Sequence, residues 1–104
     1  MPAPTVVHSL EAQKDLRKLF AWIAGKSGRA QAREVLIRLD HKMSRLGARP
    51  FIGHRRREFR GEPYSFSAPP WVIVYEPLAK GDGVYILRIL DGRQDIAALL
   101  GKKP

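Results

Sequence analysis

The sequence predicts a single α+β domain, in which two amphipathic helices pack on a curved antiparallel sheet. The expected two-layer fold also has an N-terminal strand and a short C-terminal helix. Two observations predict it: apolar residues recur at helical spacing in the first half, and β-branched and aromatic runs fill the second half. A chain of 104 residues has the size of one domain with one core. We therefore expect residues 1–104 to form one unit.

The first elements are a strand and a helix. Thr5–His8 is a β-branched run after two prolines, which is typical of a strand. Ser9 can cap the following helix, and Glu11 brings a negative charge to its first turn. One apolar face is formed by Leu16, Leu19, Phe20 and Ile23. Gly25 is the expected end of this helix, and Ser27 or Gly28 begins the next segment.

A second helix follows and keeps the same period. Its apolar residues are Ala32, Val35, Leu36, Leu39, Met43 and Leu46. Gly47 and Pro50 end it. Neither helix can bury its apolar stripe alone, so we expect the pair to form an αα-hairpin that lies on a sheet.

The rest of the chain supplies the sheet. Residues 57–59 and 64–67 are predicted to be short strands joined around Gly61 and Glu62. The runs 71–76 and 84–90 are longer, and both place apolar residues on both faces. Strands of that kind lie at the centre of a sheet and are covered on both sides. We expect the helical hairpin to cover one side, and the final helix, residues 94–100, or a partner protein to cover part of the other.

The charge is strongly positive. Nineteen Lys and Arg residues against ten Asp and Glu residues give a formal net charge of +9. Such a field attracts polyanions, which leaves nucleic acid, an acidic protein or an anionic membrane surface as partners. The alternative is a basic surface without a specific role.

Several functional classes are not expected. The chain has no cysteine, which excludes disulfides and suits a reducing compartment. It shows no targeting segment and no apolar run long enough to span a bilayer, so we expect a cytoplasmic protein without membrane association. The three histidines are scattered without carboxylates at ligand spacing, so we expect no metal and no other cofactor.

A basic cluster lies between the second helix and the sheet. It comprises Arg49, His54, Arg55, Arg56, Arg57 and Arg60. Consecutive arginines cannot all point into a core, so most of them face water. They can contact phosphates or pair with acidic groups of a protein. The alternative is a solvated sheet edge that discourages aggregation.

Two further arginines stand in the closing segment. Arg88 interrupts an apolar strand, so it requires either a partner or an open cleft. Arg93 lies in the turn that follows, and Tyr75 on the neighbouring strand can approach both. Together the three can line the concave face of the sheet. The alternative is a structural ion pair of Arg88 with Glu76 or Asp91.

The order and spacing of these elements resemble the RelE/ParE toxin superfamily, over nearly the whole chain. The resemblance includes Asp15-Leu16, the alanine-rich start of the second helix, and Leu46 followed by Pro50 and Gly53. It continues in the strand VIVYE and in the ParE-type ending ILRILDGRQDIAALL. The resemblance implies a toxin of a type II toxin–antitoxin system, neutralised by an acidic antitoxin in a hetero-oligomer. ParE-like members poison DNA gyrase, and RelE-like members cleave messenger RNA on the ribosome.

The residues favour the gyrase alternative. Cleavage of RNA through its 2′-hydroxyl needs a base, cations and an acid. RelE-like enzymes carry a tyrosine or histidine near the C-terminus, and QDIAALLGKKP has neither. Trp71 stands where many relatives have a basic residue, and Asp91 stands where ParE-like chains commonly have histidine. We expect a non-enzymatic ParE-like gyrase inhibitor. The ribosome-dependent endonuclease and a non-toxic nucleic-acid-binding module remain alternatives.

Overall fold

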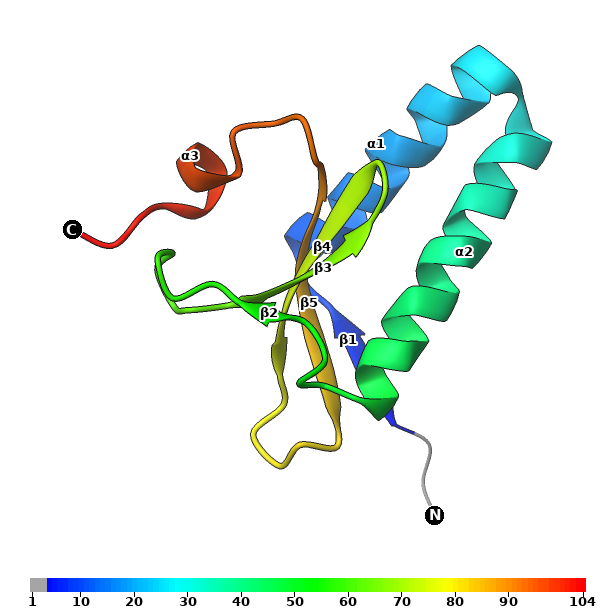
Figure 1. The fold of residues 1–104 in the computed structure, drawn as a ribbon. Helices are drawn as coiled ribbons and strands as arrows, with labels where there is room; N and C mark the ends of the chain where they lie inside the picture. Colours follow the sequence, from blue (N-terminus) through cyan, green and yellow to red (C-terminus); the bar gives the residue numbers. More distant parts are fainter. Residues whose placement is uncertain (1–3) are drawn as a thin grey trace.

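The computed structural model describes residues 4–104. Three helices and five strands follow each other along this part of the chain (Figure 1). In chain order they are β1 (Thr5–His8), α1 (Leu10–Ser27), α2 (Arg29–Ala48), β2 (His54–Arg55), β3 (Tyr64–Ala68), β4 (Trp71–Pro77), β5 (Gly83–Asp91) and α3 (Ile96–Leu100). Within residues 4–104, no helix is long and apolar enough to cross a membrane.

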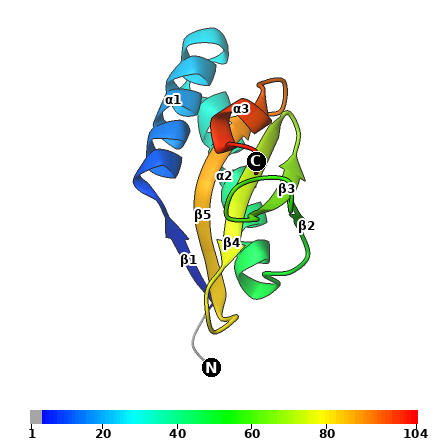
Figure 2. The ribbon, with the colours of Figure 1, turned by 90° about the vertical axis from the view of Figure 1, so that its left-hand side faces the viewer.

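The strands form one curved sheet in the order β1-β5-β4-β3-β2 (Figure 2). β4 and β5 lie inside the sheet, which confirms the prediction for residues 71–76 and 84–90. The sheet is mixed, because β1 runs parallel to β5 while the other pairs are antiparallel. The strands after the hairpin form the predicted antiparallel sheet, and the N-terminal strand adds to it in parallel. A helical hairpin connects β1 to the rest of the sheet and allows this parallel return.

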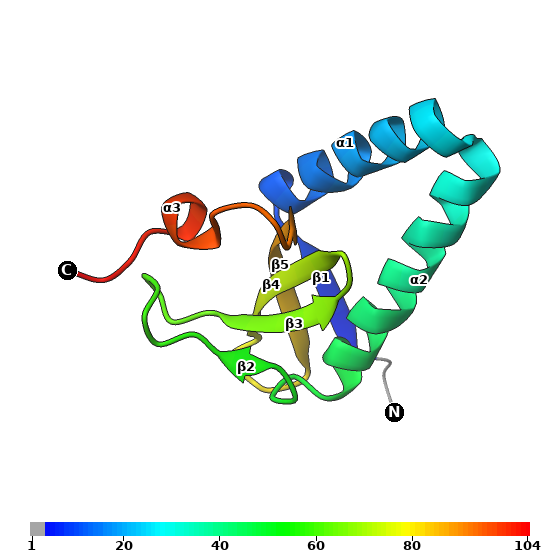
Figure 3. The same ribbon diagram turned by 45° about the horizontal axis from the view of Figure 1, so that its top comes forward.

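The two long helices cover one side of the sheet, and α3 lies on the other (Figures 1 and 3). The buried core lies between the hairpin and the sheet. Its helical part consists of Ala12, Leu19, Ile23, Ala32, Leu39, Met43 and Leu46. Its sheet part consists of Ala68, Ile73, Tyr75, Val84, Ile86 and Ile89. Every apolar helix position predicted to face the sheet is either in this core or packed against it.

The helix ends follow local sequence signals. Ser9 caps α1, since its Oγ accepts a hydrogen bond from the Ala12 N–H at 2.9 Å. The predicted end at Gly25 is wrong, and α1 continues to Ser27. Gly28 ends it, with a φ of 90° that only glycine adopts without strain. Gly25 is exposed inside the helix, and nothing lies within 4 Å of the position that a Cβ would take there.

The predicted strand at residues 57–59 is also wrong. The strand before β3 is shorter and earlier, at β2, where His54 pairs with Ser65 and Arg55 with Tyr64. The chain then turns, because the Phe59 N–H donates to the Arg56 carbonyl at 3.2 Å. Phe59 is 3% exposed, and it forms a single bridge with Lys102 of the C-terminal segment. Pairing of Phe59 with a residue more than 40 positions later in the chain thus replaces the expected strand.

A hydrogen-bonded clamp fixes the loop after α2 to the middle of the sheet. The fully buried Tyr75 donates its hydroxyl hydrogen to the Pro50 carbonyl at 2.9 Å and accepts from the Gly53 N–H at 3.0 Å. Gly53 is required at this position, since a Cβ there would lie 2.4 Å from the Tyr75 hydroxyl oxygen. Burial raises the pKa of Tyr75. The phenol therefore serves as a neutral internal hydrogen-bonding group.

Replacing Tyr75 with Phe tests the clamp. The substitution removes both hydrogen bonds while keeping the ring, so we expect the free energy of unfolding to fall by about 1–3 kcal/mol. Urea denaturation measures it. Tyr85→Phe is the matched control, because Tyr85 lies on β5 and its hydroxyl forms no hydrogen bond within residues 4–104. An equal loss in both variants would contradict the clamp.

Candidate functional site

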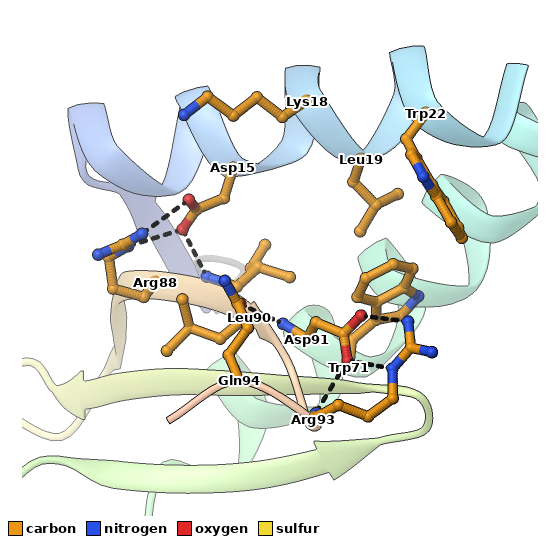
Figure 4. Close-up of a pocket in the computed structure, with 11 residues that line it drawn as sticks. Asp15, Lys18, Leu19, Trp22, Trp71, Arg88, Leu90, Asp91, Arg93 and Gln94 are labelled. Atoms are coloured by element: carbon orange, nitrogen blue, oxygen red, sulfur yellow. Dashed lines mark hydrogen bonds and ion pairs between the residues drawn. The ribbon is translucent and has the colours of Figure 1, made fainter. Parts of the chain in front are cut away.

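The main functional candidate is a cleft between α1 and the end of β5, which we call the α1 cleft (Figure 4). It has a volume of about 440 Å³. It is lined by Asp15, Lys18, Leu19, Trp22, Trp71, Arg88, Ile89, Leu90, Asp91, Arg93 and Gln94. Two of the predicted site residues, Arg88 and Arg93, therefore share one cleft with two tryptophans.

Asp15 is the centre of the hydrogen bonding in this cleft. Its two carboxylate oxygens accept from the Arg88 guanidinium at 2.8 and 3.0 Å. One of them also accepts from the Ile89 backbone N–H at 2.9 Å. The side chains of Asp15 and Arg88 are only 11% and 26% exposed. The two-pronged geometry is the strong form of an Arg–carboxylate pair, and it raises the pKa of Arg88.

This pair corrects one alternative for Arg88. The predicted structural partner was Glu76 or Asp91, but the partner is Asp15 on α1. The reason is the register of the sheet: Arg88 lies opposite Val74, and Glu76 lies opposite Tyr85. Arg88 thus reaches over the edge of β5 to the helix. Its guanidinium remains at the rim of the α1 cleft, so a ligand there meets an arginine whose direction is fixed.

Arg93 is held by its own turn. Its guanidinium donates to both oxygens of Asp91, at 3.1 and 2.8 Å, and its backbone N–H donates to the same carboxylate at 2.9 Å. These hydrogen bonds lower the pKa of Asp91 to about 2. The Arg93 side chain is nevertheless 78% exposed. It is oriented toward solvent at the mouth of the cleft, where a partner can reach it (Figure 4).

Tyr75 does not join the two arginines. Val74, its neighbour, lies opposite Arg88, and successive side chains of a strand point to opposite faces. Tyr75 accordingly belongs to the core on the helix side. The predicted grouping of Tyr75, Arg88 and Arg93 on one concave face is therefore not formed. The sequence could not reveal this, because apolar residues on both faces of β4 hide which face each residue takes.

The remaining predicted residues form a second group, around the turn between β2 and β3. Arg55 pairs with Glu62 at 3.4 Å, and Arg56 pairs with Glu58 at 3.2 Å. The Arg60 guanidinium lies 3.5 Å from the Lys102 carbonyl oxygen. Among residues 4–104, Arg57 forms no ion pair, and it is exposed. We call Arg55, Arg56, Arg57 and Arg60 the turn cluster.

Asp15, Trp22 and Trp71 also contribute to the α1 cleft, and none of them was among the predicted site residues. Asp15 was noted only as part of the family resemblance, and its role needs the three-dimensional proximity of α1 and β5. Trp22 is 51% exposed on α1 although a large ring at a helical position is usually buried. Trp71 forms the opposite wall. In the described residues, no group of three or more His, Cys, Asp or Glu side chains could hold a metal ion.

Replacing Asp15 tests whether its hydrogen bonds to Arg88 and Ile89 anchor α1 to β5. Asp15→Ala leaves both the Arg88 guanidinium and the Ile89 N–H without an acceptor, so we expect the free energy of unfolding to fall by about 2–4 kcal/mol. Arg88→Ala should cost less, because Asp15 keeps its bond to the Ile89 N–H. Denaturant unfolding measures both. Glu11→Ala, in the exposed Glu11–Lys14 pair of the same helix, is the control and should cost less than about 1 kcal/mol. A larger loss for Arg88→Ala than for Asp15→Ala would argue against this anchor.

The Asp91–Arg93 pair predicts a pH effect. The pKa of Asp91 is depressed to about 2 from its ordinary 3.8. Its contribution to stability is therefore complete above about pH 4 and is lost as the pH falls toward 2. Arg93→Ala should return the pKa of Asp91 toward 3.8, which an NMR titration of the carboxyl carbon measures. An unchanged titration would show that Arg93 does not hold this carboxylate.

The chain is similar to known proteins over most of its length. The family model described as "ParE toxin of type II toxin-antitoxin system, parDE" matches residues 6–96. The chain is 37% identical to toxin ParE3 of Caulobacter vibrioides over 98 residues, which cover 94% of this chain and 96% of that protein. The match includes both helices, the sheet and the α1 cleft.

Solved structures share the fold. The chromosomal ParDE toxin–antitoxin system of P. aeruginosa superposes with a TM-score of 0.70 at 16% identity, covering 86% of this chain and 96% of that one. The toxin–antitoxin complex RelBE2 of Mycobacterium tuberculosis gives 0.60 at 22% identity, covering 86% and 99%. With the family model and the curated relative, they identify this chain as a member of the ParE toxin family, within the RelE/ParE superfamily, and thus as the toxin of a type II toxin–antitoxin system.

Proposed function

We propose that this toxin acts by binding DNA gyrase, without catalysis of its own, and that an acidic antitoxin neutralises it. The observation that carries the proposal is that its candidate catalytic groups are already engaged. The Tyr75 hydroxyl is buried and bonded to Pro50 and Gly53, and Arg88 is bonded to Asp15. The Tyr75 hydroxyl is therefore not available to transfer a proton, and the Arg88 guanidinium is not available to stabilise a phosphate during a reaction.

The chemistry of RNA cleavage supports the same proposal. A general acid must protonate the leaving oxygen and needs a pKa near the working pH. Asp91, at the mouth of the α1 cleft, has a pKa of about 2 and is therefore ionised at neutral pH. A carboxylate there repels a scissile phosphate. The residues that line this cleft include no histidine and no tyrosine. The cleft is suited to holding a segment of protein.

The antitoxin is the partner whose chemistry fits the α1 cleft and the turn cluster. The cleft offers the exposed face of Trp22, half of whose surface is accessible, beside the cations Lys18 and Arg93. An apolar anchor flanked by arginine is typical of the centre of a protein interface. The net charge of +9 favours a segment rich in Asp and Glu. We infer that such a segment fills the cleft in a toxin–antitoxin hetero-oligomer.

Two alternatives remain. A ribosome-dependent endonuclease needs an acid and a base, for which the engaged Tyr75 and the ionised Asp91 are poor candidates. A nucleic-acid-binding module without toxicity agrees with the basic charge but not with membership of a toxin family. Cuts in messenger RNA would indicate the endonuclease, and a protein that affects neither gyrase nor messenger RNA would indicate the non-toxic module.

A supercoiling assay tests the gyrase proposal. Purified toxin should inhibit gyrase supercoiling or stabilise cleaved DNA, and it should leave ribosome-bound messenger RNA intact. Arg93→Ala and Arg57→Ala remove exposed cations outside the core, so we expect each to weaken inhibition about 5- to 30-fold with little change in stability. Arg33→Ala, an exposed position on α2, is the control and should inhibit as the wild type does.

The outcomes separate the alternatives. Ribosome-dependent cuts in messenger RNA, with gyrase unaffected, would establish the endonuclease. Full inhibition by Arg93→Ala and Arg57→Ala would remove both residues from the target surface. Addition of the antitoxin should restore supercoiling at one equivalent, and the same two variants, compared in calorimetry, report which of the two surfaces the antitoxin covers.

A further inference from the structure

A third cationic surface lies outside the α1 cleft and the turn cluster, along one flank of α2. It consists of Arg38, Lys42 and Arg45 of α2 and of Arg49, the residue that caps the C-terminal end of this helix, and we call it the α2 stripe. The spacing of 4 and 3 residues brings the three helical cations to the same side of a helix with 3.6 residues per turn, and Arg49 follows at the helix end. At a rise of about 1.5 Å per residue, Arg38, Lys42 and Arg45 follow a nearly straight line about 10 Å long. Arg38, Arg45 and Arg49 are exposed, and Lys42 is half-buried.

The α2 stripe has no internal partner. Within residues 4–104, none of its four side chains forms an ion pair or a hydrogen bond with another residue. The helix has only two carboxylates. Glu34 lies one turn before Arg38 and limits the stripe at that end, and Asp40 lies about 200° around the helix from Arg38. Four adjacent positive charges therefore repel one another without internal compensation.

The neighbouring strand holds part of the stripe in place. Lys42 and Arg45 lie over the Phe66 ring of β3, at 5.7 and 5.9 Å from its centre. Such contacts fix the direction of a flexible cationic side chain. A groove of about 280 Å³ adjoins them, between α2 and residues 68–71. Arg38 and Lys42 line it, and no carboxylate does. These cationic side chains are thus positioned to bind an anion.

The composition of the stripe favours nucleic acid over protein. Centres of protein interfaces are depleted of charged residues and contain exposed apolar anchors. The large exposed apolar residues are Val7, Leu10, Trp22, Ile37, Phe51, Ile52 and Leu99. None lies among the helical positions Arg38, Lys42 and Arg45: Ile37 points about 100° away from Arg38, and Phe51 and Ile52 lie beyond Arg49. Regularly spaced Lys and Arg residues without such anchors suit contacts to a phosphate backbone.

The same surface favours a duplex over a single strand. Single-stranded nucleic acid is held by aromatic rings on which bases stack. The ring in this surface, Phe66, already lies under Lys42 and Arg45 and has little free face. A rigid, straight row of cations fits the regular backbone of a duplex, which carries one charge per ~1.7 Å of helix axis. Recognition of RNA duplexes relies in part on contacts to the 2′-hydroxyl, whereas a row of Lys and Arg is suited to phosphates.

We propose that the α2 stripe is a binding site for the phosphate backbone of duplex DNA. Its four cations contact phosphates without reading the base sequence, and the charge of the stripe is balanced by the DNA. The site is separate from the surface assigned to the antitoxin and does not depend on gyrase being the target. A toxin held on DNA in this way has a raised local concentration near any target that works on DNA.

Binding of a fluorescent 20-base-pair duplex to the full-length toxin, without gyrase, tests the site. Four phosphate contacts predict that the logarithm of the association constant falls with the logarithm of salt concentration with a slope of about −3.6. The variant combines Arg38→Gln, Lys42→Gln, Arg45→Gln and Arg49→Gln. We expect it to lose at least ~30-fold in affinity at low salt and to flatten the slope to about −1 or less. A single strand of equal length should bind the wild type more weakly.

A charge-matched variant provides the control. It combines Lys14→Gln, Arg17→Gln, Arg29→Gln and Arg33→Gln, which are exposed positions outside the stripe. It should keep the affinity for the duplex within about threefold, and thermal unfolding should show that both variants are folded. Equal losses in the two variants would reduce the effect to net charge and overturn the site. Unchanged DNA binding by the stripe variant, with weakened antitoxin binding, would make the stripe a protein contact and also overturn it.

Discussion

The carboxylate of Asp15 determines how the helical hairpin lies on the sheet. β1 has four residues and β5 has nine, and the last residue of β1, His8, pairs with Ile86. The edge of β5 beyond Ile86 therefore has no neighbouring strand. The chain closes this edge with α1 instead. Ser9 donates its backbone N–H to the Ile86 carbonyl and its hydroxyl to the Leu87 carbonyl, and Asp15 accepts from the Ile89 N–H. α1 and its cap therefore provide hydrogen-bond partners for backbone groups at the open edge of β5. The same helix carries the apolar stripe that covers the sheet.

The same anchor determines where the positive charge of the molecule is available. Arg88 is neutralised by Asp15, and Arg93 is balanced by Asp91 although it stays exposed. The α1 cleft is consequently less cationic than its sequence suggests, and its accessible tryptophan becomes its main feature. Cations without an ion-pair partner among residues 4–104 lie elsewhere, on the α2 stripe and at Arg57 of the turn cluster. The cleft thus presents an apolar anchor and the α2 stripe presents cations, and these two surfaces suit ligands of different kinds.

Local patterns were enough to predict the helices and the central strands, because each depends on periodicity within about ten residues. They failed where a distant contact decides the structure. Residues 57–59 turn instead of extending because Phe59 pairs with Lys102. The partner of Arg88 lies 73 residues earlier in the chain. The side of the sheet that Tyr75 occupies was hidden because β4 is apolar on both faces. Of the candidate site residues, the two arginines of the cleft were found and the carboxylate that orients one of them was not.

Trp71 separates the two surfaces. It lines the α1 cleft and also the groove beside the α2 stripe, because it begins β4 between Ala68 and Asp91 of the neighbouring strands. A lysine or arginine at this position would join the cations of both surfaces into one continuous track, and a single polyanion could then occupy both. A half-buried indole instead interrupts the charge with apolar surface. The ring places apolar surface between the cations of the cleft and those of the helix, so a polyanion bound along α2 meets an indole before it reaches the cleft.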